Sequence, residues 1–513
     1  MLTRDSFLRL PAKMPSRRSL AVVVLTATTL LALLVAYQRL GAWSGLGDPP
    51  YHRDPHKSQY APQGTGSFNN GGHTYPASNG NGNGTDTRRP PPGRDPMCHG
   101  FPEANNVLVV VKTGASEAFA RLPTQLMTML KCIPNFLIFS DMDQEIAGYK
   151  IHDSLSTVLK EVRDGNPDFD LYRRQKACIV DQDNCNKLGD PKSEGWHLDK
   201  YKNTHMAEKT YAMRPGFDWY VFIDADTYVL WPSLVHWLQK LKPTKKHYLG
   251  SVTLINNFSF GHGGSGYVLS KAAIEDFVVN HPGVGNLYDA RAKGECCGDY
   301  VFAMALKETT ELGVNQVWPT INGEKPSTIP FGPSHWCHPI VTMHHVNSEE
   351  INSLWDFERR RYNKQGAFSR PSPVLIRDIF NEFFAPKLAA KRDDWNNRAD
   401  DRFYLDTKDE SRKWDKWMLD RMKKAEDYNQ FEKKAHKSFD DCAAACKSLS
   451  DCFQFLYKDG QCSIGKSFRL GQPVKKEKDQ KKRPFSGWDV DHIQNFIKKQ
   501  GDCNKIHWPN VKE

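Results

Sequence analysis

One stretch constrains the fold of this 513-residue chain more than any other: FDWYVFIDADTYVLW, from Phe217 to Trp231. It holds an apolar run, Trp219 to Ile223, that ends at two carboxylates, Asp224 and Asp226, with one small residue between them. A strand buried on both faces of a parallel sheet has such an uninterrupted apolar run. Acidic residues at its carboxyl end lie where open α/β sheets bind their ligands. The stretch therefore predicts a central strand that ends in an acidic site.

The spacing of the two carboxylates suggests a cation site. Alternate residues of an extended segment point to the same side, so Asp224 and Asp226 can converge on one ion. A strand followed by an Asx turn explains the same residues without any ligand. The choice between these interpretations depends on motifs elsewhere in the chain.

The N-terminal residues predict a membrane anchor. Residues 20–37 carry no charge, and residues 1–19 contain five basic side chains and one acid. The positive-inside rule then predicts a cytoplasmic tail at 1–19, a transmembrane signal anchor at 20–37 and a lumenal remainder. A cleaved signal peptide is the rival, but the apolar run is long for one and no clear cleavage site follows.

Residues 38–97 are rich in Gly, Asn, Pro and Ser, which predicts a disordered lumenal stem. Glycosylation sequons begin at Asn83 and Asn257. Together with the anchor, this layout predicts a single-pass type II glycoprotein of the Golgi or ER membrane with its catalytic part in the lumen.

Residues 98–350 alternate between strand and helix patterns, beginning with the apolar run Val107 to Val111. This alternation predicts an α/β domain with a mostly parallel twisted sheet and a nucleotide-type crevice. A helix is expected from Asp199 to Met213, and its lysines, Lys200 and Lys202, are expected on a solvated face rather than at a phosphate.

Three later motifs carry polar residues that can serve a site. A glycine-rich turn spans Gly261 to Ser270, Asp299 opens a helix, and His344 and His345 end a β-like run. Glycines before a helix let the backbone approach a ligand, although tight strand–helix packing explains them equally well. Asp299 can be a helix cap, and the histidines can be core residues.

The C-terminal third divides into two parts. Residues 351–437 are highly charged with interspersed aromatics, which predicts a helical extension packed on the preceding domain. Residues 438–513 contain a cysteine-rich segment that resembles a PAN/apple-like module, in which disulfides are favoured over zinc. Its cysteines are Cys442, Cys446, Cys452 and Cys462.

The odd number of cysteines in each of two regions predicts a disulfide between them. Seven cysteines precede residue 340 and five follow residue 440, so complete pairing requires at least one bridge between the regions. Cys503 is the first candidate for that bridge. Cys178 and Cys185 are expected to pair, and Cys337 is expected to pair with Cys296 or Cys297.

The net charge of +10 excludes no fold, but its distribution argues against nucleic acid as a partner. Most of the excess comes from the N-terminal tail and from the run Lys475 to Arg483, without a basic face interleaved with aromatics. The sequence leaves open whether the chain forms a dimer.

The motifs VVVKTG, DADTYV, GGSGYVLSK, CGDYV and MHHV, taken in this order, resemble the fringe and core-1 β-1,3-galactosyltransferase family, most closely its fungal-type members. The resemblance covers roughly residues 105–348. It implies a nucleotide-diphospho-sugar transferase (GT-A-like) domain, manganese, a UDP-sugar donor and inversion at the anomeric carbon. Ala225 replaces the middle acid of the family's triple acid, and Gly298 replaces the acid before Asp299.

The resemblance assigns a role to each candidate residue. Asp226 would be the direct Mn²⁺ ligand, Asp224 a second ligand or a donor contact, and His344 the remaining protein ligand, with His345 in reserve. Asp299 would be the catalytic base that takes the proton from the acceptor hydroxyl. The expected contacts to the UDP-sugar donor are Asp224, Gly264, Gly266 and Tyr267.

The sequence thus predicts a UDP-sugar-dependent hexosyltransferase that acts on a glycan or glycoprotein acceptor. An inactive relative that binds glycoproteins as a lectin or folding partner is the alternative. A secreted adhesive glycoprotein is a third interpretation, and it requires cleavage of the anchor.

Overall fold

The largest sheet of the computed structural model has eight strands in the order β11-β7-β10-β5-β1-β2-β4-β3, within described residues 95–365, 372–409 and 411–512. Adjacent strands in the series β5-β1-β2-β4 are parallel. Strand β10 is antiparallel to both of its neighbours, β5 and β7. The α/β class is therefore confirmed, with a mixed sheet. Its strands are β1 (Val107–Lys112), β2 (Phe136–Ser140), β3 (Gln144–Ile146), β4 (Tyr149–Asp153), β5 (Trp219–Asp224), β7 (Tyr248–Gly250), β10 (Tyr267–Ser270) and β11 (Asn315–Gln316).

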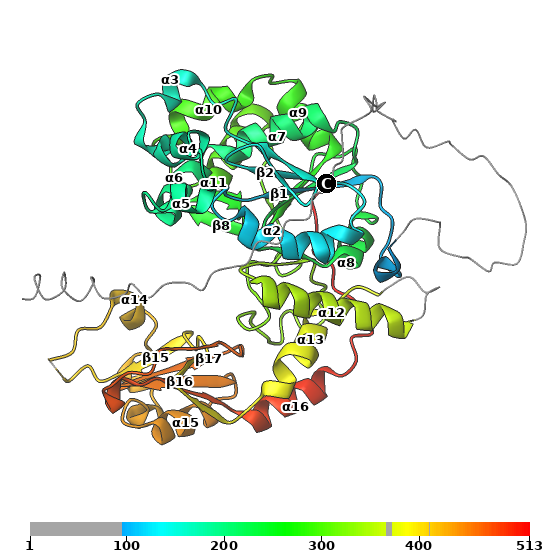
Figure 1. The fold of residues 1–513 in the computed structure, drawn as a ribbon. Coiled ribbons are helices and arrows are strands. Elements are labelled where there is room, and N and C mark those ends of the chain that lie inside the picture. Colours follow the sequence, from blue (N-terminus) through cyan, green and yellow to red (C-terminus); the bar gives the residue numbers. More distant parts are fainter. Residues whose placement is uncertain (1–94, 366–371, 410, 513) are drawn as a thin grey trace, which may run out of the picture. The chain divides into compact units, whose positions relative to one another are not determined.

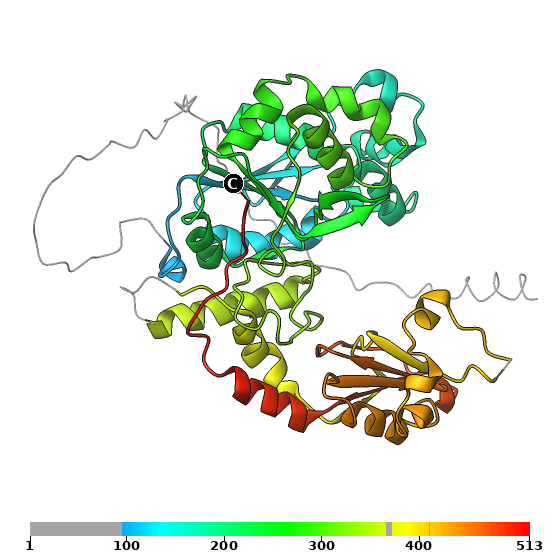
Figure 2. The same cartoon turned by 180° about the vertical axis from the view of Figure 1, so that it is seen from behind.

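The two central strands, β1 and β5, are buried on both faces, as their apolar runs predict. Because side chains alternate along a strand, Val109 and Val221 enter one core while Val110 and Phe222 enter another. Helices cover both sides of the sheet (Figures 1 and 2). The first core includes α2 (Ala118–Met127), α8 (Trp231–Leu238) and α12 (Ser348–Gln365), and the second includes α7 (Lys202–Met213), α9 (Lys271–Val279), α10 (Val284–Ala292) and α11 (Gly298–Thr310).

Shorter elements complete this domain. Strand β6 (Tyr228–Val229) pairs with β12 (Thr342–Met343), and β8 (Val252–Ile255) pairs with β9 (Phe258–Gly261). The short helices are η1 (Pro96–Cys98), η2 (Met129–Cys132), α3 (Lys160–Arg163), η3 (Pro167–Phe169), α4 (Asp170–Lys176), α5 (Gln182–Asn186) and α6 (Pro191–Asp199).

A second sheet, with the order β13-β19-β16-β17-β15, forms a C-terminal module over residues 391–488. Its strands are β13 (Lys391–Asp393), β15 (Arg402–Leu405), β16 (Gln454–Lys458), β17 (Gln461–Gly465) and β19 (Phe485–Trp488), and α15 (Phe439–Lys447) packs on one face. Other elements of this third of the chain are α13 (Ile376–Ile379), η4 (Phe380–Phe384), η5 (Ala385–Lys387), β14 (Trp395–Asn396), α14 (Lys416–Leu419), η6 (Ala425–Asp427), η7 (Glu432–Lys434), β18 (Gln472–Pro473), η8 (Gln480–Lys482) and α16 (Val490–Gln500).

Residues 351–437 differ from the predicted helical extension. They begin with helix, but β13, β14 and β15 lie inside this range and pair with strands from residues 461–488. The pairing partners are far away in sequence, so the local charge pattern carried no sign of them.

The fold-class prediction included a single N-terminal transmembrane helix, and the structure corrects this part. In the described portion of the chain, no helix has both the length and the apolar character needed to cross a bilayer. The longest, α12, has 18 residues but carries many charged side chains and covers a core with one face. The predicted cytoplasmic tail and anchor lie outside the described residues, as do residues 38–94 of the predicted stem, whereas its last residues begin η1.

One disulfide, Cys337–Cys503, joins the two folded parts of the chain. All twelve cysteines are paired. The expected Cys178–Cys185 bridge is confirmed, and Cys503 makes the expected bridge between regions. Its partner is Cys337, so the expected pairing of Cys337 with Cys296 or Cys297 was wrong. The chain after α16 returns to the first domain, where the His507 N–H donates to the Cys337 carbonyl.

Candidate active site

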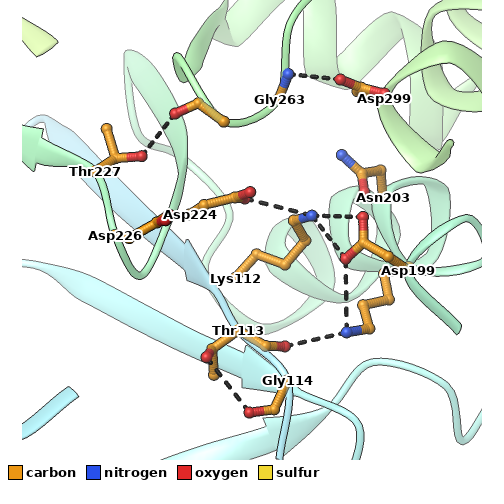
Figure 3. A network of polar contacts seen from close by, with 12 residues as sticks. Lys112, Thr113, Gly114, Asp199, Asn203, Asp224, Asp226, Thr227, Gly263 and Asp299 are labelled. Carbon is orange, nitrogen blue, oxygen red and sulfur yellow. Dashed lines mark hydrogen bonds and ion pairs between the residues drawn. The ribbon is translucent and has the colours of Figure 1, made fainter. Parts of the chain in front are cut away.

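A charged network occupies the edge of the large sheet where its parallel strands end (Figure 3). The strand register places Lys112, the last residue of β1, beside Asp224, the last residue of β5. The Lys112 ammonium lies 2.7 Å from the Asp199 carboxylate and 3.4 Å from Oδ1 of Asp224. Burial by itself would lower the pKa of Lys112, but the two carboxylates raise it above its usual value. Lys112 therefore stays a cation held between two acids.

Lys202 extends this charged network to Asp141 and Thr113. Its side chain is 2% exposed, and its ammonium lies 2.5 Å from Oδ1 of Asp141 and donates to the Thr113 carbonyl. The expectation of a solvated face was therefore wrong for Lys202, and also for Lys200, which is 7% exposed. Helix α7 places Lys202 at the sheet edge, where Asp141 after β2 compensates it, whereas Lys200 pairs with Asp168 of η3.

A separate group of side chains has the composition of a metal site. One ligand atom from each of Asp226, His344 and His345 lies within 4.8 Å of the others. Nε2 of His344 is 3.3 Å from Oδ1 of Asp226, and Nδ1 of His345 is 3.9 Å from Oδ2. Burial would raise the pKa of Asp226, but the His344 imidazole outweighs it and lowers the pKa. A carboxylate and imidazoles suit a divalent transition metal such as Mn²⁺ or Zn²⁺.

Buried hydrogen bonds hold the backbone next to the metal-compatible cluster of Asp226, His344 and His345. The buried Gln125 amide donates to the carbonyls of Ala225 and Thr227, which fixes the backbone on both sides of Asp226. The Thr227 hydroxyl donates to the Gly264 carbonyl at 2.6 Å. A Cβ atom at Gly264 would lie 2.2 Å from Cε1 of His344, so only glycine leaves room for the imidazole.

Asp299 of α11 contacts the same glycine-rich loop at Gly263, the residue before Gly264. Its Oδ2 accepts a 2.7 Å hydrogen bond from the Gly263 N–H, and its Oδ1 accepts from the Tyr300 N–H in the first turn of α11. Burial raises the pKa of Asp299, although the Gly263 hydrogen bond opposes the effect. Figure 3 shows the contact between this carboxylate and Gly263, and the next residue, Gly264, lies against His344.

The space around position 298 explains why it is glycine. A Cβ atom there would lie 2.5 Å from the Asp199 carbonyl oxygen and 2.7 Å from Oδ1 of Asn203. An acid before Asp299 would therefore collide with the helix ends that carry the charged network.

Three predicted site residues lie outside the metal-compatible group. Asp224 pairs with Lys112 instead of joining Asp226, and burial raises its pKa. Tyr267 is 1% exposed and stacks between Phe222 and Phe302, so it belongs to the core rather than to a ligand surface. Gly266 also packs under the strands, because its φ of +85° and the nearby Phe222 carbonyl leave no room for a side chain.

The sequence interpretation missed Lys112, Asp141, Asp199 and Gln125. Lys112 is the last residue of β1, and Asp141 directly follows β2. Because ligands bind at the carboxyl ends of parallel strands, these positions could have identified both residues as site candidates. Nothing in the local pattern marks Asp199 or Gln125, which come from helices.

Comparison with known families gives the site a context. Residues 103–318 match the Fringe-like family model. The match includes Lys112, Asp226 and Asp299 but ends before His344 and His345, and it indicates similarity to the Fringe-like family in this part of the chain. A comparison with curated proteins gave no significant match.

Proposed function

We propose that the chain transfers a hexosyl residue from a UDP-sugar to a glycan or glycoprotein acceptor, with inversion and a β-1,3 linkage. The Fringe-like match supports the coarse class. One observation carries the rest: a single loop contacts the metal-compatible cluster through Gly264 and the carboxylate of Asp299 through Gly263. A candidate cation site and a candidate base therefore lie against adjacent residues of one loop, an arrangement suited to transfer from a nucleotide sugar.

Asp226 and His344 would hold Mn²⁺, with His345 available at the exposed side of the cluster. The ion, when bound, would neutralise the charge that develops on the departing diphosphate. Asp224 supports this arrangement through its ion pair with Lys112. That pair keeps a second negative charge in place beside the cluster without making Asp224 a ligand.

Asp299 is the base in this proposal. It would accept the proton of the acceptor hydroxyl while the oxygen attacks the anomeric carbon from the face opposite the leaving UDP. The hydrogen bond from Gly263 fixes the orientation of the carboxylate, and burial raises its pKa toward the range where a carboxylate is an effective base.

The compartment and the C-terminal module are also part of the proposal. Six disulfides are expected of a protein that folds in the lumen of the secretory pathway, in the Golgi or the ER. The module's helix, sheet and two internal bridges support a PAN/apple-like assignment.

A turnover screen tests the function. Purified protein is incubated with each UDP-sugar, a panel of glycan acceptors and either Mn²⁺ or EDTA, and UDP release is measured. We expect transfer with one donor, loss of transfer in EDTA, and loss by about 10² to 10⁴ in Asp299→Asn with UDP binding retained. Unchanged turnover in Asp299→Asn would remove this residue from the mechanism.

A further inference from the structure

Helix α15 covers one face of the C-terminal sheet, and a cavity lies against part of the other face. Phe455, Cys462 and Ile464 point toward α15 and form a core with its cysteines. Because side chains alternate, Leu456 and Ser463 point the other way. There they line a cavity of about 660 Å³, within the usual size range of ligand sites.

The floor of this cavity contains an unsatisfied hydroxyl. Ser463 is 1% exposed, and its Oγ has no hydrogen-bond partner among the described residues. The strand register places it between Leu456 of β16 and Phe403 of β15, both of which also line the cavity. A buried hydroxyl without a partner costs free energy, so a ligand that hydrogen-bonds to it would recover that cost.

The rest of the cavity is lined by the Trp417 ring and by polar side chains, some positively and some negatively charged. Trp417 on α14 is 48% exposed, and its ring is fixed by an edge contact with Phe403 at 5.1 Å and by the Arg421 guanidinium at 5.3 Å. The polar rim residues are Asn396, Arg398, Asp400, Lys458, Gln461, Lys475 and Glu477.

We propose that this cavity binds a neutral oligosaccharide. A pyranose ring presents a C–H face that can pack on Trp417 and Leu456, and hydroxyls that can reach both the floor and the rim. An apolar ligand would leave the Ser463 hydroxyl unpaired, and a strongly charged ligand would meet rim groups of both signs. The ligand class follows from the cavity alone and does not require the transferase proposal.

A short chain of contacts runs from one rim residue of the cavity to His344 of the candidate active site. The Arg398 guanidinium lies 3.2 Å from the carboxylate of Glu324, and the Glu324 carbonyl accepts the N–H of His344. If the proposed transfer occurs, an oligosaccharide in the cavity would therefore be held near the cluster that contains His344, as part of a longer acceptor.

The test measures binding of four tetrasaccharides to the full chain by saturation-transfer NMR and calorimetry, without any nucleotide sugar. The probes are mannotetraose, chitotetraose, laminaritetraose and β-1,4-galactotetraose. We expect at least one to bind. Trp417→Ala should weaken it at least about tenfold. Phe431→Ala, an aromatic side chain 43% exposed outside the cavity, is the matched control and should bind as the native chain does.

Ser463→Ala separates binding from folding. Because the hydroxyl has no partner in the free protein, its removal should leave the melting temperature unchanged or raised. It should weaken saccharide binding by about 3- to 10-fold, the value of one hydrogen bond. The proposal is overturned if no tetrasaccharide binds, if both variants bind as the native chain does, or if only an apolar dye occupies the cavity.

Discussion

A buried carboxyl group next to the segment that carries Asp226 allows the most quantitative prediction. Glu358 on α12 is fully buried, and its two oxygens accept hydrogen bonds from the hydroxyls of Tyr228 and Tyr362 at 2.6 and 2.7 Å. Burial raises its pKa from 4.5 to about 7, although both hydrogen bonds oppose the rise. Tyr228 is two residues from Asp226, so this carboxyl group supports the segment that carries the candidate metal ligand.

The sign of the pH effect follows from proton binding. Between pH 4.5 and 7 the folded chain keeps the Glu358 proton while the unfolded chain has lost it, so the free energy of unfolding falls as pH rises. A pKa difference of about 2.5 corresponds to roughly 3 kcal/mol, with the loss complete above pH 7. Glu358→Gln keeps the shape and removes the ionisation, so it should be more stable than the native chain at pH 8 by up to that amount.

Thermal melts from pH 4 to pH 8 provide the assay. We expect Glu358→Gln to melt higher than the native chain at pH 8, by roughly 2 °C per kcal/mol, and to lose this advantage near pH 4.5. Glu145→Gln, at an exposed position of β3, is the control and should follow the native profile. A difference between Glu358→Gln and the native chain that is the same at every pH would refute the reasoning, because the effect would then be one of packing.

Three further substitutions test the site and its support. Gly264→Ala should weaken Mn²⁺ binding in calorimetry at least about tenfold by displacing His344, while Gly313→Ala, with open space around its Cβ, should not. Lys112→Met should lower stability in thermal melts by about 1–3 kcal/mol and abolish turnover, because two carboxylates lose their cation; retained turnover would contradict this role. Replacing the Cys337–Cys503 bridge with serines should cost about 2–5 kcal/mol in denaturant unfolding, more than removing a bridge across a short loop.

Much of the catalytic fold could be predicted from local sequence. The apolar runs of β1 and β5 show burial on both faces, and the change to Asp224 marks the end of β5. The metal-compatible pair Asp226 and His344 was also found, because a carboxylate after a strand and a histidine after a β-like run are visible as patterns.

The remaining features depend on contacts between distant segments. Asp224 and Asp226 alternate correctly for a shared ion, but Lys112 from the neighbouring strand pairs with Asp224, and no local pattern reveals that choice. Lys202 looked like a surface residue because the acids that compensate it come from other elements. The strands between 391 and 405 were hidden in a charged stretch for the same reason, since their partners lie over fifty residues later.

The central claim is that Asp226 and His344 hold a divalent ion together with UDP. Electron paramagnetic resonance of free Mn²⁺ during titration into the full chain, with and without UDP, measures this directly. The account predicts one Mn²⁺ bound per chain, more tightly when UDP is present, and loss of that binding in Asp226→Asn. Equal Mn²⁺ binding by the native chain and Asp226→Asn, or no binding by either, would contradict it.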